Sequence, residues 1–184
     1  MVVSRVQLSK AVSLALRHEP WLHELELDAE GWAPVDQLLA ALASRGGDWR
    51  TIDRESLVDM VESVAKQRHE LVGDRIRARY GHSLPGRIEM TPSDPPEVLF
   101  HGTAPGTWRS IRVDGLRPMG RQYVHMSVDV ETAMAVGRRK SDVPVLLSVA
   151  TSEAVAAGVE FFAGNAKVWL ALHVPPEFIR TDAP

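Results

Sequence analysis

The sequence of 184 residues contains no cysteine, only four lysines and no long apolar run. The absence of cysteine excludes disulfide bonds, thiolate zinc sites and a cysteine nucleophile. No apolar stretch approaches the roughly 18 residues that a membrane-spanning helix needs, and residues 1–5 lack the apolar core of a signal peptide. We therefore expect a cytoplasmic protein without a membrane partner, and separately we expect a monomer.

The chain also has fewer basic than acidic residues: 21 Lys and Arg residues against 24 Asp and Glu residues give a formal net charge of −3. This balance argues against a broad, non-specific grip on nucleic acid. The charges are nevertheless segregated along the chain: residues 19–36 hold six acids and no Lys or Arg, whereas residues 66–79 hold five bases and two acids. A local basic site is therefore compatible with an acidic protein.

The N-terminal half reads as a helix, a short loop or strand, two helices and a hairpin. Apolar residues at helical spacing predict helices over residues 9–18, 35–44 and 53–65, with Pro34 in the first turn of the second and Asp53 as the N-cap of the third. Alternation around Gly73-Asp74 predicts a hairpin of residues 70–72 and 75–79. This order is the outline of a winged helix.

A proline-rich stretch, residues 83–97, separates this half from the next and reads as a linker between two lobes. Beyond it we expect strands at 98–101, 123–126, 145–149 and 168–174, the first ended by Gly102, and helices at 108–113 and 130–139. The chain is thus expected to be an α+β protein with lobes at residues 1–84 and 97–184.

The candidate chemical groups are arginines and histidines. Arg17-His18 at the end of the first helix could grip an oxyanion or simply complement the helix dipole. Three arginines of the 75–79 strand share one face, which suits either a track for phosphates or an ordinary exposed face. No acid pair, metal cluster, P-loop or Rossmann fingerprint is present. Such a set suits stabilisation of negative charge, as in phosphoryl transfer.

Several segments, in their order along the chain, resemble the RNA 2′-phosphotransferase family, whose NAD-dependent members remove an internal 2′-phosphate in tRNA splicing. The segments are Leu8-Ser9-Lys10-Ala11, Leu16-Arg17-His18, Gly31-Trp32, Lys66-Gln67-Arg68, Arg75-Ile76-Arg77-Ala78, Gly81-His82-Ser83, His101-Gly102-Thr103, Gly115-Leu116-Arg117-Pro118-Met119 with Arg121, Val124-His125-Met126-Ser127 and Val168-Trp169-Leu170.

The resemblance implies an RNA-binding winged-helix lobe at 1–84 and an NAD-binding, ADP-ribosyltransferase-like lobe with a split β-sheet at 97–184. It also implies the reaction. The RNA 2′-phosphate attacks C1″ of the nicotinamide ribose, which releases nicotinamide and leaves ADP-ribosylated 2′-phospho-RNA. Ribose O2″ then attacks phosphorus, which gives RNA with a free 2′-hydroxyl and ADP-ribose 1″,2″-cyclic phosphate. NAD is consumed and no metal is needed.

The resemblance also assigns roles to single residues. The family's essential Arg-His-Arg-Arg set falls on Arg17, His18, Arg68 and Arg121, whose guanidiniums would surround the phosphate. His18 would either transfer a proton or bind the phosphate as imidazolium. The nicotinamide riboside end of NAD would meet His101, Gly102, Thr103 and Ser127, and the RNA substrate would meet Lys10, Arg77 and His82.

Some positions depart from the family pattern. His69 and Tyr80 stand where Phe and Gln are common, Tyr123 replaces a usual His, and Met126 a usual Leu. Residues 161–167, expected to form a loop, lose the usual Ser, Asn and Gly before Val168-Trp169-Leu170 and have Gly164, Ala166 and Lys167 there.

Two other functions stay open. One is an ADP-ribosyltransferase that caps terminal phosphates of RNA or DNA. The other is a non-catalytic winged-helix nucleic-acid binder that senses NAD. The complete Arg-His-Arg-Arg set argues against this function, because a sensor would not need all four residues.

Overall fold

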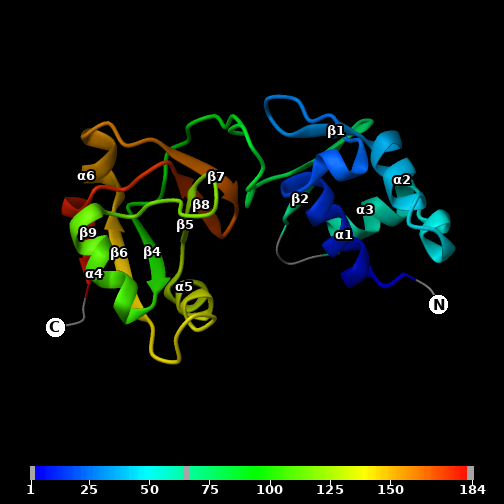
Figure 1. Cartoon of the computed structure of the whole chain (residues 1–184). Coiled ribbons are helices and arrows are strands. Elements are labelled where there is room, and N and C mark those ends of the chain that lie inside the picture. The colour runs from blue at the N-terminus through cyan, green and yellow to red at the C-terminus, as the bar shows by residue number, and fades with distance from the viewer. Residues whose placement is uncertain (1–2, 64–66, 182–184) are drawn as a thin grey trace. The chain divides into compact units, whose positions relative to one another are not determined.

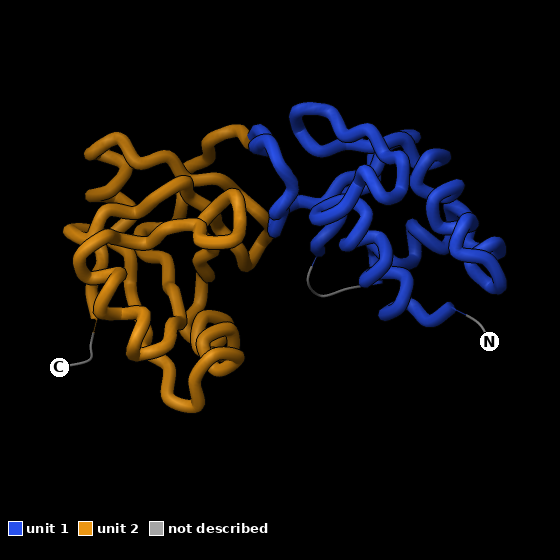
Figure 2. Tube along the Cα trace, in the orientation of Figure 1, with its two compact units in different colours: residues 1–89 blue, residues 90–184 orange. Residues whose placement is uncertain are grey.

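The computed structural model describes residues 3–63 and 67–181 and divides the chain into two compact units, residues 1–89 and 90–184 (Figures 1 and 2). Each unit has its own hydrophobic core. No helix among the described residues is long and apolar enough to cross a membrane.

The first unit follows the expected order of elements. It contains α1 (Arg5–Arg17), the 3₁₀ turn η1 (Pro20–His23), β1 (Trp32–Pro34), α2 (Val35–Ala43), the 3₁₀ turn η2 (Gly47–Thr51), α3 (Arg54–Glu62), β2 (His69–Val72) and β3 (Arg75–Ala78). The strands form an antiparallel sheet in the order β1-β3-β2, so the β2–β3 hairpin gains a third strand from β1. Buried residues of the helices and of β3 make the core: Leu16, Leu38, Leu57, Met60 and Ile76.

Local caps set where the helices of this unit begin. The predicted N-cap Asp53 is confirmed, because its carboxylate accepts the Ser56 N–H at 2.9 Å. Helix α1 begins at Arg5, earlier than expected, because Ser4 and Gln7 form a capping box. Pro34 ends β1 and is the N-cap of α2 with extended ψ, so its predicted place in the first helical turn is wrong. Residues 64–65 of the expected third helix lie outside the described residues.

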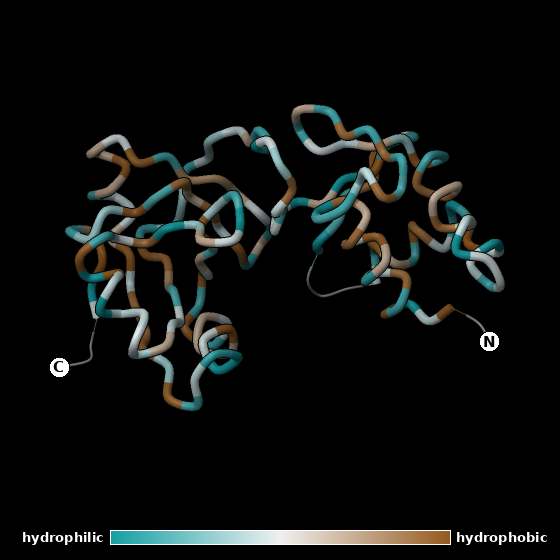
Figure 3. Tube along the Cα trace, viewed as in Figure 1, coloured by the Kyte–Doolittle hydropathy of each residue, from teal (hydrophilic) through white to brown (hydrophobic). Residues whose placement is uncertain are grey.

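The second unit is built around a six-stranded antiparallel sheet in the order β7-β8-β5-β4-β6-β9. Its elements are β4 (Val98–Thr103), α4 (Pro105–Asp114), β5 (Val124–Ser127), α5 (Val130–Gly137), β6 (Val145–Ala150), α6 (Thr151–Ala156), β7 (Phe161–Asn165), β8 (Val168–Ala171), the 3₁₀ turn η3 (Pro176–Phe178) and β9 (Ile179–Thr181). In Figure 3, apolar stretches drawn in brown alternate with polar ones along both units.

Two expectations for this unit are wrong. Gly102 does not end the first strand, because β4 continues through Thr103 and pairs with β6 over its whole length. The segment expected to be a loop is mostly strand β7, which pairs with β8. Asn165 closes the turn between them, since its side-chain oxygen accepts the N–H groups of Lys167 and Val168 at 2.8 Å. Helix α6 and strand β9 were not anticipated from the sequence.

Candidate phosphate and cofactor site

Arg17, the last residue of α1, has its guanidinium turned inward. The residue is only 9% exposed. Its Nη2 donates to the Arg68 carbonyl at 3.1 Å, and its guanidinium carbon lies 5.5 Å from the centre of the Tyr80 ring. Gly81 follows with φ of +89°, a left-handed conformation that lets the chain turn beside the guanidinium. The cation is therefore placed by neighbouring backbone and an aromatic face.

His18 caps the same helix end. Its Nδ1 lies 2.8 Å from Ser83 Oγ, and the Ser83 N–H donates to the Arg17 carbonyl at 3.0 Å. The Ser83 N–H thereby satisfies one of the carbonyls that a helix C-terminus leaves without a partner. One residue, Ser83, thus fixes both the helix end and the orientation of the imidazole.

Arg68 is held next to this helix end through its backbone. Its carbonyl accepts from Arg17 Nη2 and from the Arg79 N–H at 3.0 Å, whereas its side chain is exposed. The next residue, His69, is buried and its Nε2 lies 3.1 Å from Ser13 Oγ on α1. Burial, followed by the charges of Arg17 and Arg68, lowers the pKa of His69 to about 3, so its ring is neutral at physiological pH.

His82 is buried and lies among cations. Burial, followed by the charges of Arg17, His18 and Arg77, lowers its pKa to about 4. Its Nε2 is buried and has no hydrogen-bond partner among the described residues. Because His82 stays neutral near pH 7, it can meet a phosphate as a hydrogen-bonding group but not as a cation.

The structure therefore brings together Arg17, His18, the Arg68 backbone and His82 of the first unit. Lys10 is exposed on α1, seven residues before Arg17, which is about 10 Å along a helix axis. Arg121 belongs to the second unit, where it is exposed in a turn closed by its N–H on the Pro118 carbonyl at 3.2 Å. Within the described residues, no group of three or more His, Asp or Glu side chains could hold a metal ion.

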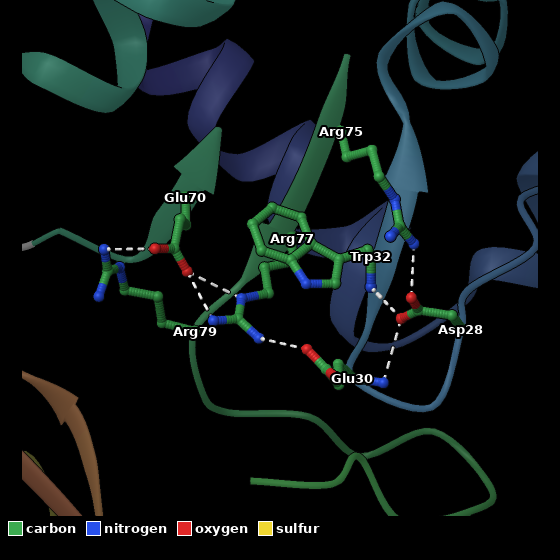
Figure 4. Close-up of polar contacts among 7 residues, drawn as sticks. All are labelled: Asp28, Glu30, Trp32, Glu70, Arg75, Arg77 and Arg79. Carbon is green, nitrogen blue, oxygen red and sulfur yellow. Dashed lines mark hydrogen bonds and ion pairs between the residues drawn. The ribbon is translucent and has the colours of Figure 1, made fainter. Parts of the chain in front are cut away.

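The three arginines of the β3 region share one face, as predicted, but acids occupy it (Figure 4). Glu70 pairs with Arg77 at 2.8 Å and with Arg79 at 3.1 Å. Arg77 also lies 3.7 Å from Glu30 and stacks over Trp32, 4.4 Å from the ring centre. As a substrate ligand, Arg77 would have to give up part of these contacts.

Asp28 completes this surface, which we call the wing face (Asp28, Glu30, Trp32, Glu70, Arg75, Arg77 and Arg79). Burial raises the pKa of Asp28, but the Trp32 N–H, the hydrogen bond and charge of Arg75 and the Glu30 N–H together hold it below its ordinary value. The wing face thus opposes three arginines with three carboxylates. This balance favours the interpretation as an ordinary exposed face over that as a phosphate track.

In the second unit, β4 and β5 separate after one register pair, Phe100 with Ser127. Past this point the His101 side chain bridges the strands, because its Nδ1 lies 2.9 Å from the His125 carbonyl. A carbonyl only accepts, so Nδ1 carries the proton and Nε2 of the neutral ring is an acceptor. Thr103 and Ser127 are both buried.

Gly102 lies within this region for a reason of packing. A Cβ there would lie 2.1 Å from the Ala133 carbonyl oxygen of α5 and 3.1 Å from the Gly137 N atom. The missing side chain therefore makes room for α5 on β4. On that side of Gly102, the atoms that come close to the glycine belong to helix α5 and not to a ligand.

The fold and these groups define an α+β protein with a basic Arg-His cluster suited to phosphate chemistry. Residues 3–173 match the model of the family described as "RNA 2'-phosphotransferase, Tpt1 / KptA family". The chain is 48% identical over 182 residues to a "Probable RNA 2'-phosphotransferase" of Acetivibrio thermocellus, covering 99% of this chain and 100% of that protein. It is 52% identical over 175 residues to one of Bacillus thuringiensis subsp. konkukian, covering 95% and 94%. The chain belongs to the RNA 2′-phosphotransferase family.

Proposed function

We propose that this protein is an NAD-dependent RNA 2′-phosphotransferase, with a winged-helix lobe at residues 1–84 and an ADP-ribosyltransferase-like lobe at 97–184. Its substrates would be an RNA with an internal 2′-phosphate and NAD. Family membership supports the transfer of a 2′-phosphate from RNA. The observation that carries the proposal most directly is the buried Arg17, held by the Arg68 carbonyl beside His18.

This cluster fits a phosphate. Arg17 offers a guanidinium whose position is already set, so little side-chain entropy is lost when an anion binds. Besides burial, the charge of Arg17 lowers the pKa of His82, so the guanidinium of Arg17 acts directly on this buried ring. Charge-assisted hydrogen bonds from guanidinium to phosphate oxygens are among the stronger ones available to a protein. We assign Arg17, His18 and Arg68 to the phosphate of the substrate, together with Arg121.

The divergence of β4 and β5 supports an NAD site in the second unit. The Nε2 of His101 is an acceptor, which suits a ribose hydroxyl, and Thr103 and Ser127 add hydroxyl groups on the same strands. NAD supplies C1″, from which nicotinamide leaves, and O2″, which accepts the phosphorus. The residues of the chain would orient the two substrates and stabilise charge.

Proton transfer is assigned to His18. The second step releases an RNA 2′-oxygen that needs a proton, and it removes a proton from ribose O2″. An imidazole can perform either transfer near neutral pH. The contact of His18 Nδ1 with Ser83 Oγ fixes the orientation of the ring for this role.

The test is incubation of the protein with NAD and an RNA that carries one internal 2′-phosphate. The proposal predicts stoichiometric loss of the 2′-phosphate and release of nicotinamide. RNA that remains ADP-ribosylated, or reaction confined to terminal phosphates, would instead support an ADP-ribosyltransferase. RNA binding without nicotinamide release would contradict both enzymatic functions.

A further inference from the structure

Three consecutive basic residues follow α5 directly: Arg138, Arg139 and Lys140, which we call the basic turn. Their backbone N–H groups donate to the carbonyls of Met134, Val136 and Gly137 at 2.9, 3.2 and 3.0 Å. The backbone therefore continues the last turn of the helix, and all three side chains are exposed. The backbone of the basic turn is therefore held in place by hydrogen bonds to the end of α5.

The basic turn is also anchored to the strand that carries the candidate NAD residues. Gly137, just before it, would bring a Cβ within 3.2 Å of the Gly102 backbone, so helix and strand are in close contact here. Burial lowers the pKa of His101, its hydrogen bond to His125 raises it, and the charge of Lys140 lowers it further. Lys140 thus lies close enough to act on His101.

The charge balance of the basic turn is opposite to that of the wing face. Among the described residues, no carboxylate lies within 4.0 Å of the side-chain nitrogens of Arg138, Arg139 or Lys140. On the wing face, by contrast, the arginines meet an equal number of acids (Figure 4). The helix dipole favours cations at a helix C-terminus, but its effect falls off within the last turn. It therefore does not occupy the three exposed cations, which remain available to an anion.

We propose that the basic turn binds phosphodiesters of the RNA strand that lie beyond the dinucleotide carrying the 2′-phosphate, so that the second unit holds the RNA backbone. This inference rests on the proposed function and names the surface that its substrate uses. A row of exposed cations that form no ion pair suits the repeated charges of a single strand, because each phosphate contact releases counterions. A wing face neutralised by its own carboxylates offers no such gain.

The test compares two double variants that each remove two positive charges from the second unit. The first is Arg138→Gln with Lys140→Gln. The control is Arg109→Gln with Arg112→Gln, two exposed residues of α4. Binding is measured by fluorescence anisotropy without NAD, so that no turnover occurs, at 50, 100 and 200 mM salt. The probes are a single-stranded 12-mer with one internal 2′-phosphate and a dinucleotide with the same 2′-phosphate.

The salt dependence gives the expected size of the effect. For single strands, log K changes by about 0.7 per phosphate contact for each tenfold change in salt, so two lost contacts weaken 12-mer binding about 25-fold at 0.1 M and reduce the salt slope by about 1.4. Binding of the dinucleotide should be unchanged, and the α4 control should match the wild-type protein with both probes.

Three results would overturn the inference. They are 12-mer binding and salt slope within twofold of the control, an equal loss with the dinucleotide, or an increased KM for NAD with unchanged RNA binding, which would place the pyrophosphate of NAD on the basic turn. The proposed function is judged separately, by nicotinamide release from the wild-type protein. Weakened 12-mer binding without nicotinamide release would therefore reject the proposed function and keep the RNA surface.

Discussion

Replacing Gly102 with alanine tests the close contact between β4 and α5. The new methyl would lie 2.1 Å from the Ala133 carbonyl oxygen and 2.8 Å from its carbon. An ordinary contact between carbon and oxygen needs about 3.3–3.6 Å, so one backbone must move by about 1 Å. Neither obstructing atom belongs to a flexible side chain, and Gly137 packs against the same point.

Overpacking of a well-packed interior costs typically about 1–3 kcal/mol, and occasionally more. Because backbone atoms must move, we expect Gly102→Ala to lower the free energy of unfolding by about 3 kcal/mol, measured by urea denaturation followed by circular dichroism. The control is Gly106→Ala in α4, where no atom lies within 4 Å and alanine should keep or raise stability by up to about 1 kcal/mol. If Gly102→Ala unfolded within 0.5 kcal/mol of the wild-type protein, our explanation of this glycine would be refuted.

Three further predictions concern the first unit and the reaction. Arg68→Ala or Arg121→Ala should leave folding intact and stall the reaction as ADP-ribosylated RNA, seen by gel or mass spectrometry; unchanged turnover would refute their assignment. Folded His69, with its pKa near 3, binds its proton less readily than in the unfolded chain, so its contribution to stability is present above pH 6.5 and lost as pH falls towards 3. His69→Phe should therefore reduce the pH slope of the unfolding free energy by up to about 1.4 kcal/mol per pH unit between pH 6 and 4, and equal slopes would contradict this. Glu70→Gln removes the carboxylate between Arg77 and Arg79 and should cost about 1 kcal/mol at low salt and less at 1 M salt; equal stability in both salts would contradict an ion-paired wing face.

The local signals of the sequence predicted the order of elements in the first unit well. Asp53 is a strong N-cap, and Gly73-Asp74 between alternating runs is a strong hairpin signal. These signals act over a few residues, so they need no knowledge of tertiary contacts. The apolar stripe of the first helix already begins at Val6, but the predicted helix starts at Ser9, whereas the capping box of Ser4 and Gln7 starts α1 at Arg5.

Structural features that depend on contacts between residues far apart in the sequence could not be predicted from the sequence. Strand β9 has three residues and is stabilised by pairing with β6, and β7 exists because it pairs with β8. Gly102 was interpreted through its freedom to approach a ligand, but the atom that uses this freedom, the Ala133 oxygen, lies on a helix some thirty residues later.

The candidate site shows the same division. That Arg17 and His18 close a helix could be predicted, but the contact between Arg17 and the Arg68 carbonyl joins residues 51 apart and needed the structure. The acids near Asp28 were visible as a cluster, yet their pairing with the arginines of β3 depends on the alignment of Trp32 with Arg77. Ser13, which contacts His69, carries no signal in the sequence that sets it apart from other serines. Ser83 belongs to the family-like segment Gly81-His82-Ser83, but its contacts with His18 and Arg17 needed the structure.

The fate of the phosphate tests the central claim most directly. RNA with a single internal 2′-phosphate labelled at phosphorus would be incubated with NAD, and the small-molecule products identified by mass spectrometry. The account predicts that the label leaves the RNA as ADP-ribose 1″,2″-cyclic phosphate, with one nicotinamide for each phosphate removed and no loss of label when NAD is omitted. Release of the label as inorganic phosphate, or its loss without NAD, would contradict the account.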